Sequence, residues 1–313
     1  MNENYDELIR DAYLNKSPIA QGGNSQVYKV NLDGQNYGIK YYESKQLGFS
    51  KLNHEYNCLK DIGILIPKYF NKVVFKSDTF PAMIYEWAEG SNPTAIDMKS
   101  DKILEIFFLL EETYRTKSYR FPRAIQSIEK LSDLFSILNV RLAQLSKDVI
   151  FNEQKVILNE FNSIKELLES DFEETYFDNQ TLSLSDFGSH NLIIQNETNL
   201  VRVIDLEFFG RDTSYKLICD ILLHPKNLWG NNVLELYLNF FVDNFNLDRN
   251  RISLLLKPLA LNWACIILKK QMTDSNPANA SREFDFKSKY ISWLLQLVTS
   301  KDPISHVLSK SGF

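Results

Sequence analysis

Cysteine and histidine are scarce in this chain of 313 residues, which contains three of the first and four of the second. Three scattered cysteines without a C-x-x-C pair cannot build a disulfide framework or a zinc site, and their odd number is typical of a reducing compartment. The four histidines show no metal-ligand spacing. We therefore expect a cytoplasmic protein whose fold depends on its hydrophobic core.

Long apolar runs and an excess of basic charge are also missing. The most apolar stretch, residues 259–268, is too short to cross a bilayer, and the polar N-terminal residues lack the apolar core of a signal peptide. The formal net charge of -5 argues against a dedicated nucleic-acid binder. We expect no membrane and no nucleic-acid partner, while the sequence leaves the oligomeric state open.

What is present is the composition of an ordinary folded protein, 44% hydrophobic and 24% charged. A chain of this length exceeds what one hydrophobic core usually supports, so two lobes are expected. Residues 17–85 alternate β-type runs with turn signals, whereas the pattern becomes helical after about residue 89. The sequence therefore predicts an α+β, bilobal fold, with a small antiparallel-sheet N-lobe over residues 1–88 and a mostly helical C-lobe over residues 89–313.

The periodicity also predicts individual elements. Strands are expected at residues 27–30, 37–42, 66–75 and 82–85, with one helix at 49–62. Further helices are expected at residues 103–114, 124–146, 152–170, 233–245, 252–270 and 286–299. Pro258 must either kink the helix at 252–270 or open a second one. A β-type insert over residues 183–204 interrupts the helical half, and we expect such an insert to carry function.

Two motifs in the first hundred residues suit a nucleotide. Paired glycines, Gly22 and Gly23, open a turn whose backbone N–H groups could face phosphate oxygens. Lys40 lies on a predicted strand, and Glu55 lies on the helix that follows. Such a pair can hold an ammonium group against the α and β phosphates. Taken singly, these features also fit a plain turn, a surface lysine and an unrelated carboxylate.

Two further motifs lie in the β-type insert. Asp186 and Asn191 have the D-x-x-x-x-N spacing, in which the carboxylate can accept a proton from an attacking hydroxyl and the amide oxygen can bind a metal ion. Asp205 ends an apolar strand, where a carboxylate is costly unless it has a partner such as Mg²⁺. Either aspartate taken alone also fits a turn or capping residue.

Taken together and in this order, the motifs resemble those of the protein-kinase-like superfamily. They are most similar to the aminoglycoside phosphotransferase and choline kinase family, and the resemblance extends over about residues 17–228. It implies the bilobal fold, ATP and Mg²⁺ as cofactors with GTP left open, and a small-molecule hydroxyl as phosphoryl acceptor.

The resemblance also implies roles for the nucleotide-binding residues. Gly22, Gly23 and Ser25 would cover the ATP phosphates, and Lys40 would bind the α and β phosphates, oriented by Glu55. The hinge would hold adenine through backbone hydrogen bonds, and its residues are Glu86, Trp87 and Ala88.

For the catalytic residues, the resemblance implies that Asp186 is the base and that Asn191 and Asp205 bind Mg²⁺. Glu207 stands near a second acidic position of small-molecule kinases, so it is a further candidate metal ligand. Asp220 matches an aspartate that braces the catalytic loop and is assigned a structural role.

The chain departs from the family pattern at Leu184, where a histidine is usual, and this substitution alone favours a non-catalytic kinase-like module that binds a nucleotide or protein partners. The Asp-Leu-Glu that begins at Asp205 and the lack of a peptide-docking segment argue against a protein kinase.

Acidic residues between 166 and 178 suit a cationic acceptor such as an aminoglycoside or amino alcohol, but also fit a solvated surface. A sugar hydroxyl remains an equal alternative, and no aromatic cage for a quaternary ammonium group is evident.

Overall fold

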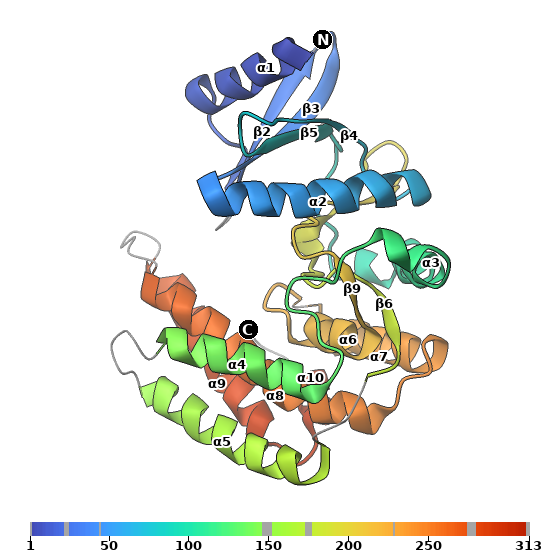
Figure 1. Ribbon diagram of the computed structural model, residues 1–313. Coiled ribbons are helices and arrows are strands. Elements are labelled where there is room, and N and C mark those ends of the chain that lie inside the picture. Colours follow the sequence, from blue (N-terminus) through green and yellow to red (C-terminus); the bar gives the residue numbers. More distant parts are fainter. Residues whose placement is uncertain are drawn as a thin grey trace. The chain divides into compact units, whose positions relative to one another are not determined.

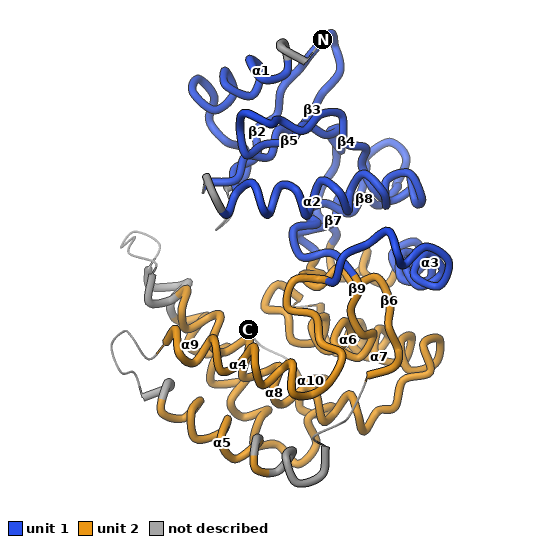
Figure 2. Tube along the Cα trace, in the orientation of Figure 1, with its two compact units in different colours: residues 1–93, 100–123, 189–210 blue, residues 94–99, 124–188, 211–313 orange. Residues whose placement is uncertain are grey.

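The computed structural model describes residues 2–21, 25–43, 45–145, 152–172, 177–227, 229–273 and 280–310. The chain forms two compact units (Figure 2). Unit 1 contains Met1–Pro93, Ser100–Arg123 and Ser189–Gly210, and unit 2 contains Thr94–Lys99, Ala124–Gly188 and Arg211–Phe313. This division by contacts differs from a boundary at residue 88, because two later segments pack with the N-terminal residues.

Unit 1 is built on a five-stranded sheet in which every neighbouring pair is antiparallel. The strand order is β1-β2-β3-β5-β4, and the strands are β1 (Ala20–Gln21), β2 (Ser25–Leu32), β3 (Gln35–Tyr42), β4 (Val73–Lys76) and β5 (Ala82–Glu86). Asp33 and Gly34 join β2 to β3 with positive φ angles of 51° and 82°. An Asp-Gly pair in this conformation is the turn that suits the twist of two paired strands.

Two helices cover opposite faces of this sheet (Figure 1). Ile9 of α1 (Asn2–Asn15) packs in one buried cluster with Tyr28 and Ile39. Lys40, the next residue on β3, points the other way and contacts α2 (Lys45–Leu65). The alternation of side chains along a strand therefore separates a purely apolar face from the face that carries charged residues. The sequence pattern did not predict α1.

The remainder of unit 1 holds α3 (Asp101–Lys117), the short helices η2 (Ser118–Arg120) and η3 (Ser189–Asn191), and a hairpin of β7 (Leu192–Ile194) and β8 (Val201–Val203). Ser91 forms a β-bridge with Ile194 at this hairpin. A Cβ on the neighbouring Gly90 would lie 2.0 Å from the carbonyl oxygen of Ile194, so only glycine allows this approach.

Unit 2 is mostly helical. Its two-stranded sheet pairs β6 (Gln180–Ser183) with β9 (Gly210–Thr213). Its helices are η1 (Asp97–Lys99), α4 (Leu131–Leu145), α5 (Asn152–Phe172), α6 (Ser214–Leu223), α7 (Asn231–Asn244), α8 (Arg249–Thr273), α9 (Ala280–Thr299) and α10 (Pro303–Leu308).

Helix α8 is the centre of unit 2 and packs against α4, α5, α6, α9 and α10. It runs continuously past Pro258. By length and composition, residues 249–270 would suffice to cross a membrane, but 67% of the most apolar window is buried inside the structure. A core helix of a globular unit has these same properties.

Three predicted elements were wrong in extent. The strand expected at 66–75 begins only at Val73, because α2 continues to Leu65 and a turn follows. The helix expected from residue 124 begins at Leu131, because the loop before it donates a hydrogen bond from Ile128 N–H to Asp212 Oδ1 (3.0 Å). The β-type insert forms a hairpin only at β7 and β8, while residues 184–188 lie outside any helix or strand and residues 189–191 form η3.

Candidate functional site

Lys40 lies at the centre of a buried charge cluster in unit 1. Its side chain is 4% exposed, and its Nζ atom lies 2.8 Å from Glu55 Oε2 and 2.7 Å from Asp205 Oδ1. These residues come from β3, α2 and the turn after β8. The structure therefore brings the predicted pair of Lys40 and Glu55 together with Asp205, which the sequence placed in a separate motif.

Glu55 joins three segments of unit 1. One carboxylate oxygen, Oε2, accepts hydrogen bonds from Lys40 and from the Tyr42 hydroxyl. The other, Oε1, accepts a hydrogen bond from Leu206 N–H at 3.0 Å. Glu55 thereby fixes Lys40 relative to the backbone directly after Asp205. Neither the Tyr42 contact nor this backbone bond was predicted from the sequence.

The cluster holds two carboxylates and one ammonium group. Burial alone would lower the pKa of Lys40, but Asp205 and Glu55 outweigh it and raise that pKa well above its ordinary value. Burial raises the pKa of Glu55 against the opposing effect of Lys40, and the charge of Asp205 adds to the increase. With all three groups ionised the cluster carries a net negative charge, which a further cation would offset.

Asp205 and Asn191 lie on adjacent turns of the β7–β8 region. Asp205 has a φ of 63°, a conformation that aspartate and asparagine adopt more readily than most residues. Its side chain is 37% exposed, which leaves it accessible from solvent. The backbone N–H of Ile204 donates to Asn191 O at 2.9 Å and so links the two turns.

Asn92 is a structural residue of this site that the sequence did not reveal. Its Nδ2 atom lies within hydrogen-bond distance of three carbonyl oxygens of the turn around Asn191, at Ser189 (3.3 Å), His190 (3.1 Å) and Leu192 (2.8 Å). The side chain therefore replaces backbone partners that a tight turn cannot supply for itself.

Glu207 is buried and lies close to α2. Its side chain is 9% exposed, and Oε2 lies 3.9 Å from Lys51 Nζ on α2. The role of Glu207 as a metal ligand stays a prediction. Its ion pair with Lys51 links it to α2.

The predicted hinge follows directly after β5. The backbone N–H of Glu86 donates to Lys72 O (3.0 Å), and that of Trp87 donates to Asn36 O (3.3 Å). Ala88 N–H has no hydrogen-bond acceptor among the residues that the structure describes. Of the three hinge N–H groups, that of Ala88 is therefore the one available to a ligand.

Tyr85 explains why a glycine precedes Lys40 by two positions. A Cβ on Gly38 would lie 2.5 Å from Tyr85 Cζ, so the tyrosine ring lies directly over the glycine on the Lys40 face of the sheet. Burial raises the pKa of the Tyr85 hydroxyl. The ring therefore contributes an uncharged wall beside the cluster.

The expected phosphate-covering turn is described only in part. Gly22 and Gly23 lie outside the described residues, and Ser25 is buried at the start of β2, where it pairs with Tyr42 of β3. The roles of these three residues stay predictions.

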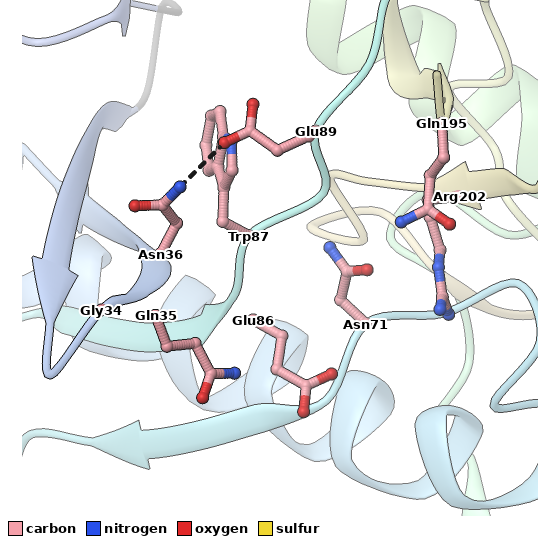
Figure 3. A pocket seen from close by; sticks show the side chains of 9 residues that line it. All are labelled: Gly34, Gln35, Asn36, Asn71, Glu86, Trp87, Glu89, Gln195 and Arg202. Carbon is pink, nitrogen blue, oxygen red and sulfur yellow. Dashed lines mark hydrogen bonds between the residues drawn. The ribbon is translucent and has the colours of Figure 1, made fainter. Parts of the chain in front are cut away.

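A cavity of about 480 Å³ lies beside the hinge in unit 1 (Figure 3). Neither Lys40, Glu55 nor Asp205 lines it. Its polar lining is formed by Gly34, Gln35, Asn36, Asn71, Glu86, Trp87, Glu89, Gln195 and Arg202. Glu89 accepts hydrogen bonds from Asn36 and Lys29, and Arg202 donates to Pro67 O, so much of the lining is already bonded within the unit.

Asp186 belongs to unit 2, where it follows β6 on a tight turn. Ser185 has a φ of 49°, and Ser183 Oγ accepts the N–H of Ser185 at 3.1 Å. Asn227 donates from Nδ2 to Phe187 O (2.9 Å) and to Ile221 O (2.9 Å), so it ties this turn to α6. The Asp186 side chain is 32% exposed, and His224 lies 2.8 Å from its Oδ1 atom.

Asp220 lies in a buried cluster on α6. Lys216 Nζ lies 2.7 Å from Asp220 and 3.2 Å from Asp212, and Trp263 Nε1 donates to Asp220 Oδ1 at 3.2 Å. Burial opposes ionisation of Lys216, but the two aspartates raise its pKa. Asp220 contacts α6 and α8, whereas Asn227 and His224 make the bonds to the Asp186 turn, so the expected bracing of the catalytic loop by Asp220 stays a prediction.

Two features relate to the acceptor groups that the sequence suggested. An aromatic pair in unit 2 contacts the amine of one of the chain's own lysines: Lys310 Nζ lies 4.8 Å from the ring centroid of Tyr290 and 5.0 Å from that of Trp293. This arrangement was not predicted from the sequence, because the two rings lie on α9 and the lysine follows α10. Of the predicted acidic wall, Glu166 and Asp178 are exposed, and the other members lie among side chains outside the description.

No protein-family model matches the sequence, and no curated protein matches it either. Solved structures do. The choline kinase LicA from Streptococcus pneumoniae is 13% identical, with a TM-score of 0.63 over 93% of this chain and 98% of that one. A choline/ethanolamine kinase family protein from Mesorhizobium loti is 13% identical, with a TM-score of 0.62 over 97% and 98%.

The aminoglycoside phosphotransferase APH(2")-IIa, in its ternary complex with streptomycin and ATP, is 17% identical, with a TM-score of 0.59 over 94% of this chain and 95% of that one. The predicted fold class is therefore confirmed: this is an α+β chain with a small antiparallel sheet and the kinase-like fold of choline kinases and aminoglycoside phosphotransferases. The resemblance seen in the motifs holds for the fold across nearly the whole chain.

Proposed function

We propose that this protein is an ATP- and Mg²⁺-dependent phosphotransferase that moves the γ-phosphoryl group to a hydroxyl of a small molecule. The observation that carries the proposal is Lys40, which is buried between Glu55 and Asp205 at 2.8 and 2.7 Å. A buried lysine needs such partners, and in a kinase-like fold this pair positions the ammonium group for the α and β phosphates.

The residues of unit 1 fit a magnesium site. The carboxylate of Asp205 and the amide of Asn191 offer oxygen ligands, which Mg²⁺ prefers. The Lys40 cluster carries one more carboxylate than ammonium groups, so it tolerates an added cation. When bound, Mg²⁺ would offset charge on the β and γ phosphates. Glu55 holds Lys40 in place for the α and β phosphates, and Ala88 N–H is available to adenine.

Asp186 is the base in this proposal. It would accept the proton of the acceptor hydroxyl as the hydroxyl oxygen bonds to the γ phosphorus and the bond to the ADP oxygen breaks. Positioning and electrostatics would supply most of the rate enhancement.

The acceptor is a sugar, an amino alcohol or an aminoglycoside-like molecule. Choline kinases and a streptomycin complex are among the proteins of similar fold, which supports an acceptor of this size. We further propose that the protein acts in the cytoplasm, without a nucleic-acid or membrane partner, and that ATP is the donor, with GTP as the alternative.

The test is thermal unfolding with Mg²⁺-ATP, Mg²⁺-GTP and metal-free ATP. A ligand at about 100 times its Kd adds roughly 2.7 kcal/mol of stability, a clear shift in Tm. We expect a magnesium-dependent shift in the wild type that Asp205→Asn loses, since asparagine tolerates the positive φ of this position and removes only the charge. Asp78→Ala, at a side chain 91% exposed, is the matched control and should keep the shift.

Turnover distinguishes the enzyme from a non-catalytic module. Asp186→Ala should keep the nucleotide-dependent shift and lose phosphoryl transfer by several orders of magnitude. No shift with any nucleotide in the wild type would overturn the proposal in favour of a kinase-like module that acts through protein contacts.

A further inference from the structure

A histidine that the motifs did not include lies against Asp186. His224 directly follows α6, and its Nε2 atom is 2.8 Å from Asp186 Oδ1. The imidazole is almost completely buried, at 5% exposure, whereas the aspartate is 32% exposed. In this contact the Asp186 carboxylate is accessible to ligands, whereas the His224 side chain is not.

A backbone bond defines the tautomer of this histidine. Lys226 N–H donates to His224 Nδ1 at 3.0 Å, so Nδ1 presents its lone pair. In the neutral ring the proton then lies on Nε2, which donates to Asp186 Oδ1. The direction of the hydrogen bond follows from this geometry: the aspartate is the acceptor.

His224 is itself held from several sides. Its carbonyl oxygen lies 3.3 Å from Lys310 Nζ, and the Tyr290 hydroxyl donates to the carbonyl oxygen of the preceding Leu223 at 2.6 Å. The edge of Trp263 packs against the ring, with centroids 5.1 Å apart and planes at 77°. A side chain fixed in this way can orient a partner more precisely than a mobile one.

We propose that His224 is a positioning residue for Asp186, an inference that rests on the proposed function. Its Nε2–H bond fixes the rotation of the carboxylate and so directs the second oxygen toward the acceptor hydroxyl. The usual histidine of the family motif is absent, and Leu184 in its place is buried in the core. An imidazole nevertheless reaches the base, from a position 38 residues later in the chain.

His224 remains neutral throughout the reaction that this assignment implies. The hydroxyl proton passes to Asp186, the hydroxyl oxygen bonds to the γ phosphorus, and the electrons of the broken P–O bond leave on ADP. The histidine neither gains nor loses a proton, which separates its role from that of a general base.

The test compares His224→Leu with His224→Gln. Leucine fills similar volume without a donor, whereas the Nε2 amide of glutamine can reach the place of the imidazole Nε2–H. We expect His224→Leu to lower kcat roughly 10- to 100-fold at unchanged KM for Mg²⁺-ATP, and His224→Gln to recover most of that loss. Both variants should keep the Mg²⁺-ATP-dependent shift in Tm, which shows that they fold.

His306→Leu is the control, because the side-chain contacts of His306 among the described residues are to the carbonyl and ring of Trp293 and not to Asp186, so this variant should leave kcat unchanged. A second readout is independent of activity: ¹⁵N NMR of His224 should show a protonated Nε2 and an unprotonated Nδ1, and the Nε2–H signal should move in Asp186→Ala.

The outcomes separate the two claims. An active wild type whose His224→Leu variant keeps its kcat, or a His224 with its proton on Nδ1, would overturn the positioning role and leave the proposed function intact. A wild type that binds Mg²⁺-ATP but phosphorylates no hydroxyl would overturn the proposed function, and the positioning role with it.

Discussion

Lys310 gives the sharpest stability prediction of the structure. Its side chain is 6% exposed, donates to the Tyr290 hydroxyl at 2.8 Å, and has no carboxylate within ion-pair distance among the described residues. Burial lowers the pKa of Lys310 from 10.5 to about 7. In the unfolded chain this lysine would titrate normally, so folding near neutral pH requires an ammonium group to lose its proton or its water.

The magnitude follows from the linkage of protonation to folding. Each unit of pKa corresponds to about 1.4 kcal/mol, so burying Lys310 costs on the order of 5 kcal/mol below pH 7. Between pH 7 and 10.5 the unfolded chain binds more protons at this residue than the folded chain does. Raising the pH therefore removes the cost, and it vanishes above the unfolded pKa.

The perturbation is Lys310→Met, which keeps the apolar stem and removes the amine. Loss of the hydrogen bonds to Tyr290 and His224 O should cost roughly 2 kcal/mol at every pH. We expect a variant that is about 3 kcal/mol more stable than wild type at pH 7 and slightly less stable at pH 10.

Urea unfolding at half-unit steps from pH 6.5 to 10 measures the difference in free energy of unfolding between the two proteins. Lys301→Met, at an exposed position nearby, is the control and should show a small difference that does not change with pH. A Lys310→Met difference that is equally independent of pH would contradict the lowered pKa, because Lys310 would then titrate alike in the folded and unfolded chains.

Three further predictions concern unit 1. Gly38→Ala should lower the free energy of unfolding by about 1–3 kcal/mol, because the added Cβ would lie 2.5 Å from the Tyr85 ring. Adding Tyr85→Leu removes this clash and should restore most of the lost stability in the same urea assay. Asn92→Ala should lower the free energy of unfolding by about 1–3 kcal/mol, because the carbonyl oxygens of the Asn191 turn lose the Asn92 donor. The variant should also show a smaller Mg²⁺-ATP-dependent shift in Tm. An unchanged shift would show that the metal site does not depend on this turn. Lys40→Met should lower the free energy of unfolding by about 3–5 kcal/mol at pH 8, because Glu55 is then a buried carboxylate without its cation. Burial raises the pKa of Glu55, so the loss should become smaller as the pH falls and the carboxylate takes up a proton; a loss that does not change with pH would contradict this expectation.

Much of the sheet could be predicted from local pattern. The strands β2 and β3 carry alternating side chains around an Asp-Gly turn, and this turn by itself favours a hairpin. The contact between Lys40 and Glu55 was predictable as well, because it follows from a lysine on one strand and a glutamate on the next helix. The extent of β4 and α4 was not, since a turn after α2 and a bond from Asp212 decide where these elements begin.

The order of the candidate functional groups could be predicted from the sequence alone: a glycine turn, a strand lysine, a helix glutamate, the D-x-x-x-x-N pair and a strand-end aspartate. The contacts that hold these groups in place depend on the tertiary structure. Asn92 contacts a turn about 100 residues later, and His224 contacts Asp186 across 38 residues. Such contacts follow no local sequence spacing and so could not be predicted from it. A buried polar side chain forms its hydrogen bonds with whichever partner the folded core places beside it, however distant that partner is in the sequence.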